Sequence, residues 1–110
     1  MVLGINQVTF PPDQSSKVAQ RYIEWLKKSP PDPTIEKTIC IGVRNTEDGN
    51  ILVIGISDIV KGKVEEALKL TIQGNLFMAA GIEGFKYKTD VMLNYTEAYK
   101  ILGMTAPAEV

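Results

Sequence analysis

The segment Ile35–Val60, IEKTICIGVRNTEDGNILVIGISDIV, carries the strongest structural signal in the chain. From residue 35 to residue 44 apolar and polar side chains alternate, which is the period of a β-strand with one drier face. Asp48-Gly49 follows and is typical of a tight reversal between antiparallel strands. Residues 51–60 are apolar at both sets of alternating positions, as in a strand covered on both faces. The segment therefore predicts a β-hairpin whose second strand lies inside a sheet.

The residues before the hairpin predict a strand followed by a helix. Residues 2–10 favour a strand, which ends at Pro11-Pro12 because proline donates no ladder hydrogen bond. Candidate N-caps of a helix follow in Asp13–Ser16. The helix ends near Ser29, since three prolines occur within the next four residues. Its apolar face is formed by Val18, Tyr22, Trp25 and Leu26.

The residues after the hairpin predict a second helix, a strand and a short third helix. The second helix covers residues 63–80, and Gly81 is expected to end it in the left-handed conformation. Gly74 has a low helix propensity, so the sequence also allows a bend or an early end at that position. Alternation over residues 82–92 indicates a strand at the edge of the sheet, because one of its sides is charged. Asn94 or Thr96 can cap a final helix that carries Tyr95, Tyr99 and Leu102.

The order β, α, β, β, α, β, α indicates an α+β protein with a ferredoxin-like βαββαβ fold and a short C-terminal helix. Residues 1–104 are expected to form one domain, and residues 105–110 a tail. Strands 1 and 3 are predicted at the centre, and both helices cover the same sheet face. The other face stays open and partly apolar, so a homodimer or a higher homo-oligomer is expected.

Composition excludes several kinds of partner. The 110 residues include 12 basic and 13 acidic side chains, for a net charge of -1, and no cationic cluster. Binding to nucleic acid or to an anionic membrane surface is therefore not expected. The longest apolar run is far shorter than a bilayer span, no signal peptide is evident, and the single cysteine cannot form an internal disulfide. These features favour a cytoplasmic protein.

The chain contains no histidine. Histidine is the commonest general base, the commonest metal ligand and the usual proximal ligand of haem. Catalytic triads, histidine-based metal sites and histidine-ligated haem are therefore not expected, and no metal or cofactor is predicted. No glycine-rich nucleotide motif occurs either.

The opening Ile5–Pro12, INQVTFPP, followed by an amphipathic helix with Trp25, resembles the start of dimeric α/β-barrel proteins. That superfamily includes antibiotic-biosynthesis monooxygenases and many small uncharacterised families. The resemblance implies two sheets that face each other in a barrel, with helices outside and a small-molecule pocket between sheet and helices. Its haem-handling members typically use a histidine, so the resemblance points away from that branch.

Seven residues are candidates for a ligand pocket, and each also has a structural interpretation. Cys40 can act as a nucleophile if Arg44 lowers its pKa, or can fill space as a small apolar residue. Tyr22 and Trp25 share a helix face that can line a pocket or pack in the core. Polar groups on expected strands complete the set, namely Asn6, Ser57 and Tyr87.

No motif fixes a reaction, and three functions remain in competition. The first is a homodimeric α/β-barrel protein that binds a small apolar or aromatic molecule. The second is a cofactor-independent monooxygenase or isomerase, consistent with several tyrosines and no histidine. The third is a structural assembly module without a ligand, for which the apolar cluster Leu76–Met78 supplies an interface.

Overall fold

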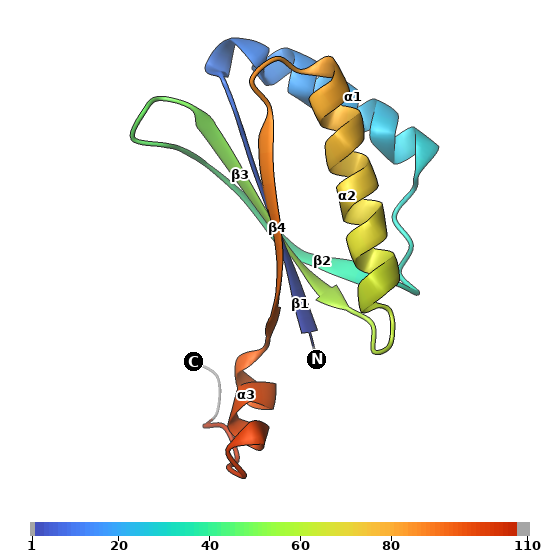
Figure 1. The fold of residues 1–110 in the computed structure, drawn as a ribbon, viewed down its shortest axis with the longest axis vertical. Coiled ribbons are helices and arrows are strands. Elements are labelled where there is room, and N and C mark those ends of the chain that lie inside the picture. The colour runs from blue at the N-terminus through green and yellow to red at the C-terminus, as the bar shows by residue number, and fades with distance from the viewer. Residues whose placement is uncertain (1, 108–110) are drawn as a thin grey trace.

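The computed structural model describes residues 2–107 and contains one four-stranded antiparallel sheet with its helices (Figure 1). The strands lie in the order β2-β3-β1-β4, which confirms the predicted ferredoxin-like α+β fold with strands 1 and 3 at the centre. The elements are β1 (Val2–Phe10), a 3₁₀ turn (Pro12–Gln14), α1 (Ser15–Lys28), β2 (Glu36–Asn45), β3 (Ile51–Ile59), α2 (Val64–Gly81), β4 (Lys86–Leu93) and α3 (Tyr95–Ile101).

The hairpin between β2 and β3 forms as predicted. Gly49 adopts a φ of 85°, a left-handed conformation that glycine enters without steric cost. β3 lies between β2 and β1, so both of its edges are hydrogen-bonded. Across the centre of the sheet Asn6 pairs with Gly55 on one side and with Thr89 on the other. These three residues therefore share one face of the sheet.

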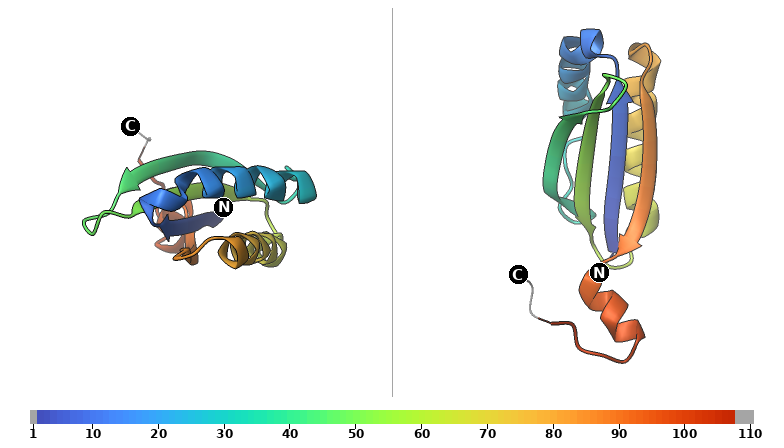
Figure 2. Two further views of the ribbon diagram at one scale, coloured as in Figure 1. Left: turned by 90° about the horizontal axis from the view of Figure 1, so that it is seen from above. Right: turned by 90° about the vertical axis from the view of Figure 1, so that its left-hand side faces the viewer.

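Both long helices cover that same face (Figure 2). α2 packs on β1 and β4, whereas α1 packs mainly on α2. The buried apolar side chains on this side of the sheet are Phe10, Ile59, Ala67, Met78 and Ile82. α1 is thus held at a distance from β2 and β3. No helix within residues 2–107 combines the length and apolar character needed to cross a bilayer.

The turn between α2 and β4 differs from the prediction. Gly81 is the last residue of α2 and is not left-handed, while Gly84 has a φ of 77° and makes the turn. β4 consequently begins at Lys86 rather than at residue 82. The helix also runs through Gly74 without ending, because tertiary packing outweighs the low helix propensity of glycine there.

A β-bulge interrupts the alternation expected along β2. Thr38 pairs with Ser57 and Cys40 pairs with Ile56, so Ile39 is an extra residue between two ladder positions. Glu36 and Thr38 therefore share the helix-facing side with Ile41. The sequence pattern had placed these two polar residues on the opposite side from Ile41.

The open face of the sheet is covered by no element in the part of the chain that the structure describes (Figure 2). Its centre is apolar and its margins are charged, with Arg44 on β2 and an ion pair of 3.8 Å between Lys88 and Asp90 on β4. The apolar residues at its centre are Leu3, Ile5, Leu52, Ile54 and Ile56.

Asn94, one of the two predicted N-caps, begins α3. Its side chain accepts a hydrogen bond of 2.9 Å from the Glu97 backbone N–H. The helix lies beyond the end of the sheet, apart from the other helices (Figure 1). The predicted tail begins after it at Thr105, and residues 108–110 of that tail lie outside the described part of the chain.

Candidate functional site

A cleft of about 990 Å³ lies between the two long helices and the sheet. Its walls are the apolar face of α1, the sheet-facing side of α2 and the helix-facing side of β1, β2 and β3. Most of its lining is apolar, and one side is open to solvent at β2, where Ile41 and Val43 are 55% and 67% exposed. Concave apolar spaces with a few polar groups are the usual form of small-molecule sites.

Glycine residues create the floor and one wall of this cleft. Gly55 lies on the floor, and a Cβ atom built there would meet no atom within 4 Å. On α2, the indole Nε1 of Trp25 lies 2.9 Å from where a Cβ of Gly74 would be. Trp25 also packs against Phe77 at a ring-centroid distance of 5.5 Å. The indole is therefore fixed at the junction of α1 and α2.

A polar cluster sits where the sheet meets α2. The side-chain amides of Asn6 and Asn75 bind each other reciprocally, with distances of 3.1 and 2.8 Å. Thr89 donates its hydroxyl to Asn6 Oδ1 at 3.1 Å and accepts from Asn75 Nδ2 at 3.2 Å. Asn75 is 3% exposed, whereas Asn6 and Thr89 reach the cleft.

One N–H of the Asn6 side-chain amide has no hydrogen-bond partner within this cluster. Asn6 Oδ1 accepts two hydrogen bonds, which fills its capacity, while Asn6 Nδ2 carries two N–H groups and uses one of them within the cluster. The remaining N–H belongs to a side chain that lines an apolar cleft. An oxygen acceptor on a ligand would complete it.

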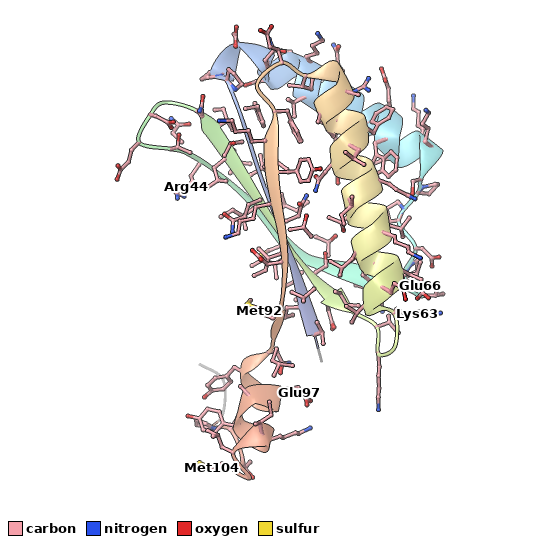
Figure 3. All side chains as sticks on the ribbon, viewed as in Figure 1. Arg44, Lys63, Glu66, Met92, Glu97 and Met104 are labelled. Atoms are coloured by element: carbon pink, nitrogen blue, oxygen red, sulfur yellow. The ribbon has the colours of Figure 1, made fainter. Side chains whose placement is uncertain are left out.

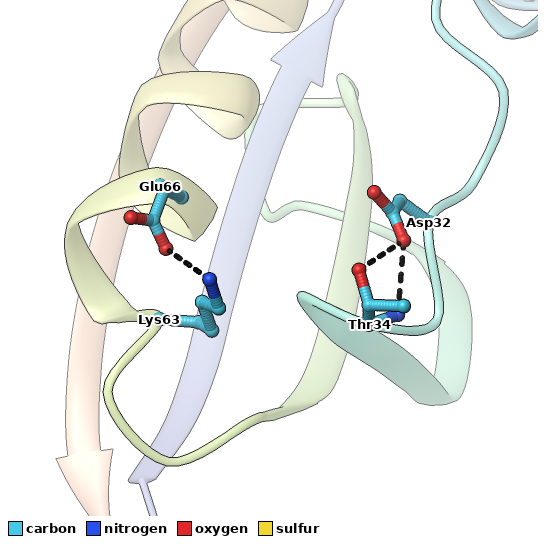
Figure 4. Close-up of polar contacts among 4 residues, drawn as sticks. All are labelled: Asp32, Thr34, Lys63 and Glu66. Carbon is cyan, nitrogen blue, oxygen red and sulfur yellow. Dashed lines mark hydrogen bonds and ion pairs between the residues drawn. The ribbon is translucent and has the colours of Figure 1, made fainter.

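One end of the cleft is charged and lies beside the proline-rich loop (Figure 4). There Asp32 accepts hydrogen bonds from the Thr34 hydroxyl and backbone N–H, at 2.6 and 2.9 Å, which hold its pKa below the usual range. Outside the cleft lining, Lys63 and Glu66 pair at 3.7 Å at the start of α2 (Figure 4). Glu36 also lines this end, and burial raises the pKa of its carboxyl.

The structure brings together four of the seven residues proposed from sequence. Asn6, Tyr22, Trp25 and Ser57 all line the cleft. Tyr87 lies on the helix-facing side of β4 but outside the cleft lining, with its ring 6.5 Å from that of Phe85.

Cys40 and Arg44 are separated from these four because they point to the open face. Cys40 pairs with Ile56 and Arg44 pairs with Leu52, both on the side away from the helices. Figure 3 shows Arg44, like Met92, projecting on that side of the sheet. After the bulge, side chains alternate between the two faces of β2, and Cys40 and Arg44 fall on the open face.

Several polar residues of the cleft region are absent from the sequence-based candidates, and three of them bear on its chemistry: Glu36, Asn75 and Thr89. Asn75 occupies the apolar stripe of α2, and a polar residue in such a stripe is a signal that a partner is buried nearby. Thr89 is an ordinary strand residue whose role depends on register. Glu36 reaches the cleft only because of the bulge at Ile39.

Within residues 2–107 no group of three or more cysteine, aspartate and glutamate side chains is arranged to hold a metal ion. The polar groups of the cleft are amides, hydroxyls and carboxylates from separate elements. Their arrangement can orient an organic ligand and, at Glu36, exchange a proton with it.

Comparison with known proteins supports the fold. No family model and no curated protein matches the sequence. Among solved structures, the designed protein Foldit4 has a TM-score of 0.55 at 10% identity, covering 84% of this chain and 97% of its own. A conserved protein from Methanosarcina mazei Go1 gives 0.53 at 7%, covering 84% and 91%.

An antibiotic biosynthesis monooxygenase is also similar, with a TM-score of 0.50 at 15% identity over 86% of this chain and 98% of that chain. Its presence among the structural neighbours, beside small conserved proteins, matches the resemblance seen in the opening residues. At these identities the likeness concerns the fold: the chain has the ferredoxin-like architecture that such monooxygenases share.

Proposed function

We propose that the protein is a homodimer that binds a small apolar or aromatic molecule in the cleft, and that the ligand carries a hydrogen-bond acceptor. The observation that carries this proposal is the cleft itself, an apolar space lined by Asn6, whose side-chain Nδ2 uses one of its two N–H groups in the bond to Asn75. The volume of about 990 Å³ is at the upper end of the range for small-molecule sites.

The polar cluster makes Asn6 a selective anchor. Asn75 and Thr89 fix the plane of its amide, so the donor is oriented before a ligand arrives. A buried donor left without a partner costs about 1–3 kcal/mol. A ligand that offers an oxygen should therefore bind more tightly than a hydrocarbon of the same shape.

The open face of the sheet supports the dimer. It presents four half-buried apolar residues on the two central strands, namely Leu3, Ile5, Ile54 and Ile56, framed by charged margins on β2 and β4. An apolar centre with a polar rim is the usual anatomy of a protein interface. A second copy of the chain offers the same surface and can bury it symmetrically.

Binding can be tested with 1-tetralone and tetralin, two bicyclic probes that differ by one carbonyl oxygen. Trp25 is the only tryptophan and lines the cleft, so changes in its emission, checked by calorimetry, report occupancy. We expect 1-tetralone to bind about tenfold more tightly, and the preference to disappear in Asn6→Ala.

A matched pair of glycine variants locates the site. Gly55→Val fills the cleft floor and should abolish binding, whereas Gly42→Val adds the same group on the open face of the neighbouring strand and should leave binding unchanged. Neither glycine has a Cβ obstacle within 4 Å or a positive φ. Equal binding by both variants would contradict the proposed site.

Glu36 favours a second function, a cofactor-independent isomerase. Its carboxylate lines the same cleft as Asn6, and burial raises its pKa, which makes the carboxylate a stronger base. Within the cleft it can take up the proton from the carbon next to a ligand carbonyl and leave an enolate.

Deuterium exchange at the α-carbon of 1-tetralone in D₂O, followed by NMR, tests this step. Exchange should be faster with the wild-type protein than with Glu36→Gln, at concentrations that saturate both. Equal exchange rates would leave binding as the function and exclude Glu36 as the base.

A further inference from the structure

We propose that the C-terminal arm, residues 94–104, crosses to a second copy of the chain and packs along the outer edge of its β2, closing the open side of that copy's cleft. This inference rests on the proposed homodimer and adds which segment each copy contributes to the other's site.

The arm carries apolar side chains that its own chain does not cover. Ile101, Leu102 and Met104 are 72%, 71% and 57% exposed. Figure 3 shows Met104 at the far end of the arm, away from the sheet. A seven-residue helix is too short to be stable alone in water, so α3 needs a surface to pack on.

The edge of β2 is an uncovered surface of the same character. β2 is an outer strand of the sheet, and Ile39, Ile41 and Val43 along it are all more than half exposed. A long apolar edge strand invites uncontrolled pairing unless another segment covers it. Ile41 and Val43 also form the open side of the cleft.

The strand order brings the two surfaces together. When two sheets of order β2-β3-β1-β4 face each other across a two-fold axis parallel to the strands, β4 of one copy lies opposite β2 of its partner. The arm follows β4 directly. Leu93, the last residue of β4, and Glu36, the first residue of β2, lie at the same end of the sheet, so the arm arrives close to the partner's Ile39.

The arm also bears on the area of the interface. Four strands about 4.8 Å apart and about 30 Å long give a sheet face of roughly 570 Å². A stable interface buries about 800 Å² on each partner. The flat area of the sheet face is only of the same order as that requirement, and the apolar residues of the arm would add to the surface that the dimer buries.

The charge of the arm favours a protein surface over a lipid surface. Glu97 and Lys100 pair with each other at 3.3 Å, and they are the only charged residues between 94 and 104. An amphipathic helix that binds anionic membranes instead has a polar face rich in lysine and arginine. The arm is therefore suited to an apolar protein edge.

Cysteine cross-linking tests the contact directly. In a Cys40→Ser background, which removes the exposed native thiol, Ile39→Cys and Leu102→Cys are introduced into separate chains. The two proteins are mixed, allowed to exchange subunits and treated with a short bismaleimide. We expect a covalent dimer that contains one chain of each kind. Ile23→Cys, exposed on α1, replaces Ile39→Cys in the control and should give little product.

Size measurement by light scattering separates the possible failures. A wild-type protein that stays monomeric at all concentrations would contradict the dimer itself. A wild-type dimer without the mixed cross-link would overturn the exchanged arm and leave the dimer intact.

The double variant Ile101→Asp/Leu102→Asp gives a second readout without disturbing the fold, because both side chains are exposed in the single chain. We expect its dimer dissociation constant to rise at least about tenfold and 1-tetralone to bind more weakly. Unchanged values of both would contradict the proposal.

Discussion

Gly74 shows how a single atom decides between helix propensity and packing. Gly74→Ala should gain about 1 kcal/mol of helix propensity. The new methyl group would meet the Trp25 indole at 2.9 Å, however, and overpacking typically costs about 1–3 kcal/mol. We expect net destabilisation of about 1 kcal/mol in urea unfolding, whereas Gln73→Ala, exposed on the same helix, should change stability little. A stabilised Gly74→Ala would show that the indole can move.

The amide pair at the cleft floor gives a second prediction at the residue scale. Asn75→Ala removes the partner of Asn6 and one partner of Thr89, so we expect a loss of about 1–3 kcal/mol of unfolding free energy. Because the two amides act as a unit, the double variant Asn6→Ala/Asn75→Ala should lose less than the sum of the single variants. Additive losses in chemical denaturation would argue against the reciprocal pair.

Glu36 makes stability depend on pH. Burial raises its pKa above the usual value near 4.5, so the folded state binds the proton more tightly than the unfolded state does. This contribution is fully present below the unfolded pKa and is lost as the pH rises through the folded pKa. Glu36→Gln should therefore be more stable than wild type near pH 7, by a fraction of a kcal/mol. The difference should vanish below about pH 4 when melting temperatures are compared across pH.

At the scale of elements, the sequence carried enough information for the strands, both long helices and their order. Period-two alternation, the Asp48-Gly49 turn and the proline stops are local signals, and local signals survive without tertiary context. The bulge at Ile39 is not local, because an extra residue in one strand is defined only by its pairing with Ser57 and Ile56. The side of β2 on which Glu36 and Thr38 lie, before the bulge, is therefore beyond prediction from sequence, whereas the alternation from Cys40 to Arg44 is as predicted.

The same reason explains the site. Asn6, Tyr22, Trp25 and Ser57 line the cleft. The sequence pattern predicts the shared helix face of Tyr22 and Trp25, but not which face of the sheet meets it. Cys40 and Arg44 are on the opposite face, while Glu36 and Thr89 reach the cleft region through register alone. The turn after α2 also depends on packing: the sequence predicts Gly81 as the left-handed stop, but in the structure Gly81 lies against the Arg21 side chain and Gly84 has the positive φ.

Adjacent residues on β4 allow the open face to be tested against a close control. Met92 and Leu93 are 43% and 46% exposed but lie on opposite faces, Met92 on the open one (Figure 3). Met92→Lys should weaken the dimer at least about tenfold in sedimentation equilibrium, because it puts a charge into the shared interface. Leu93→Lys adds the same charge on the other side, so a larger effect there would contradict pairing through the open face.

At the scale of the whole molecule, a single chain leaves apolar surface uncovered in three places: the open face, the edge of β2 and the arm. A domain of 110 residues buries only about two-thirds of the surface that its unfolded chain exposes, so these places matter for its stability. If a second copy covers them, folding and assembly are one equilibrium. Stability is then a property of the dimer and depends on protein concentration.

That coupling has a measurable size. For a dimer that unfolds directly to two chains, each tenfold increase in concentration adds about 1.4 kcal/mol, which corresponds to roughly 3–5 °C in melting temperature for this chain length. Saturating 1-tetralone should raise the melting temperature further in wild type and in Gly42→Val, but not in Gly55→Val, since only the last has a filled cleft. A melting temperature independent of concentration would show that each chain is stable with its open face in water, and the apolar centre of that face would then require a different partner.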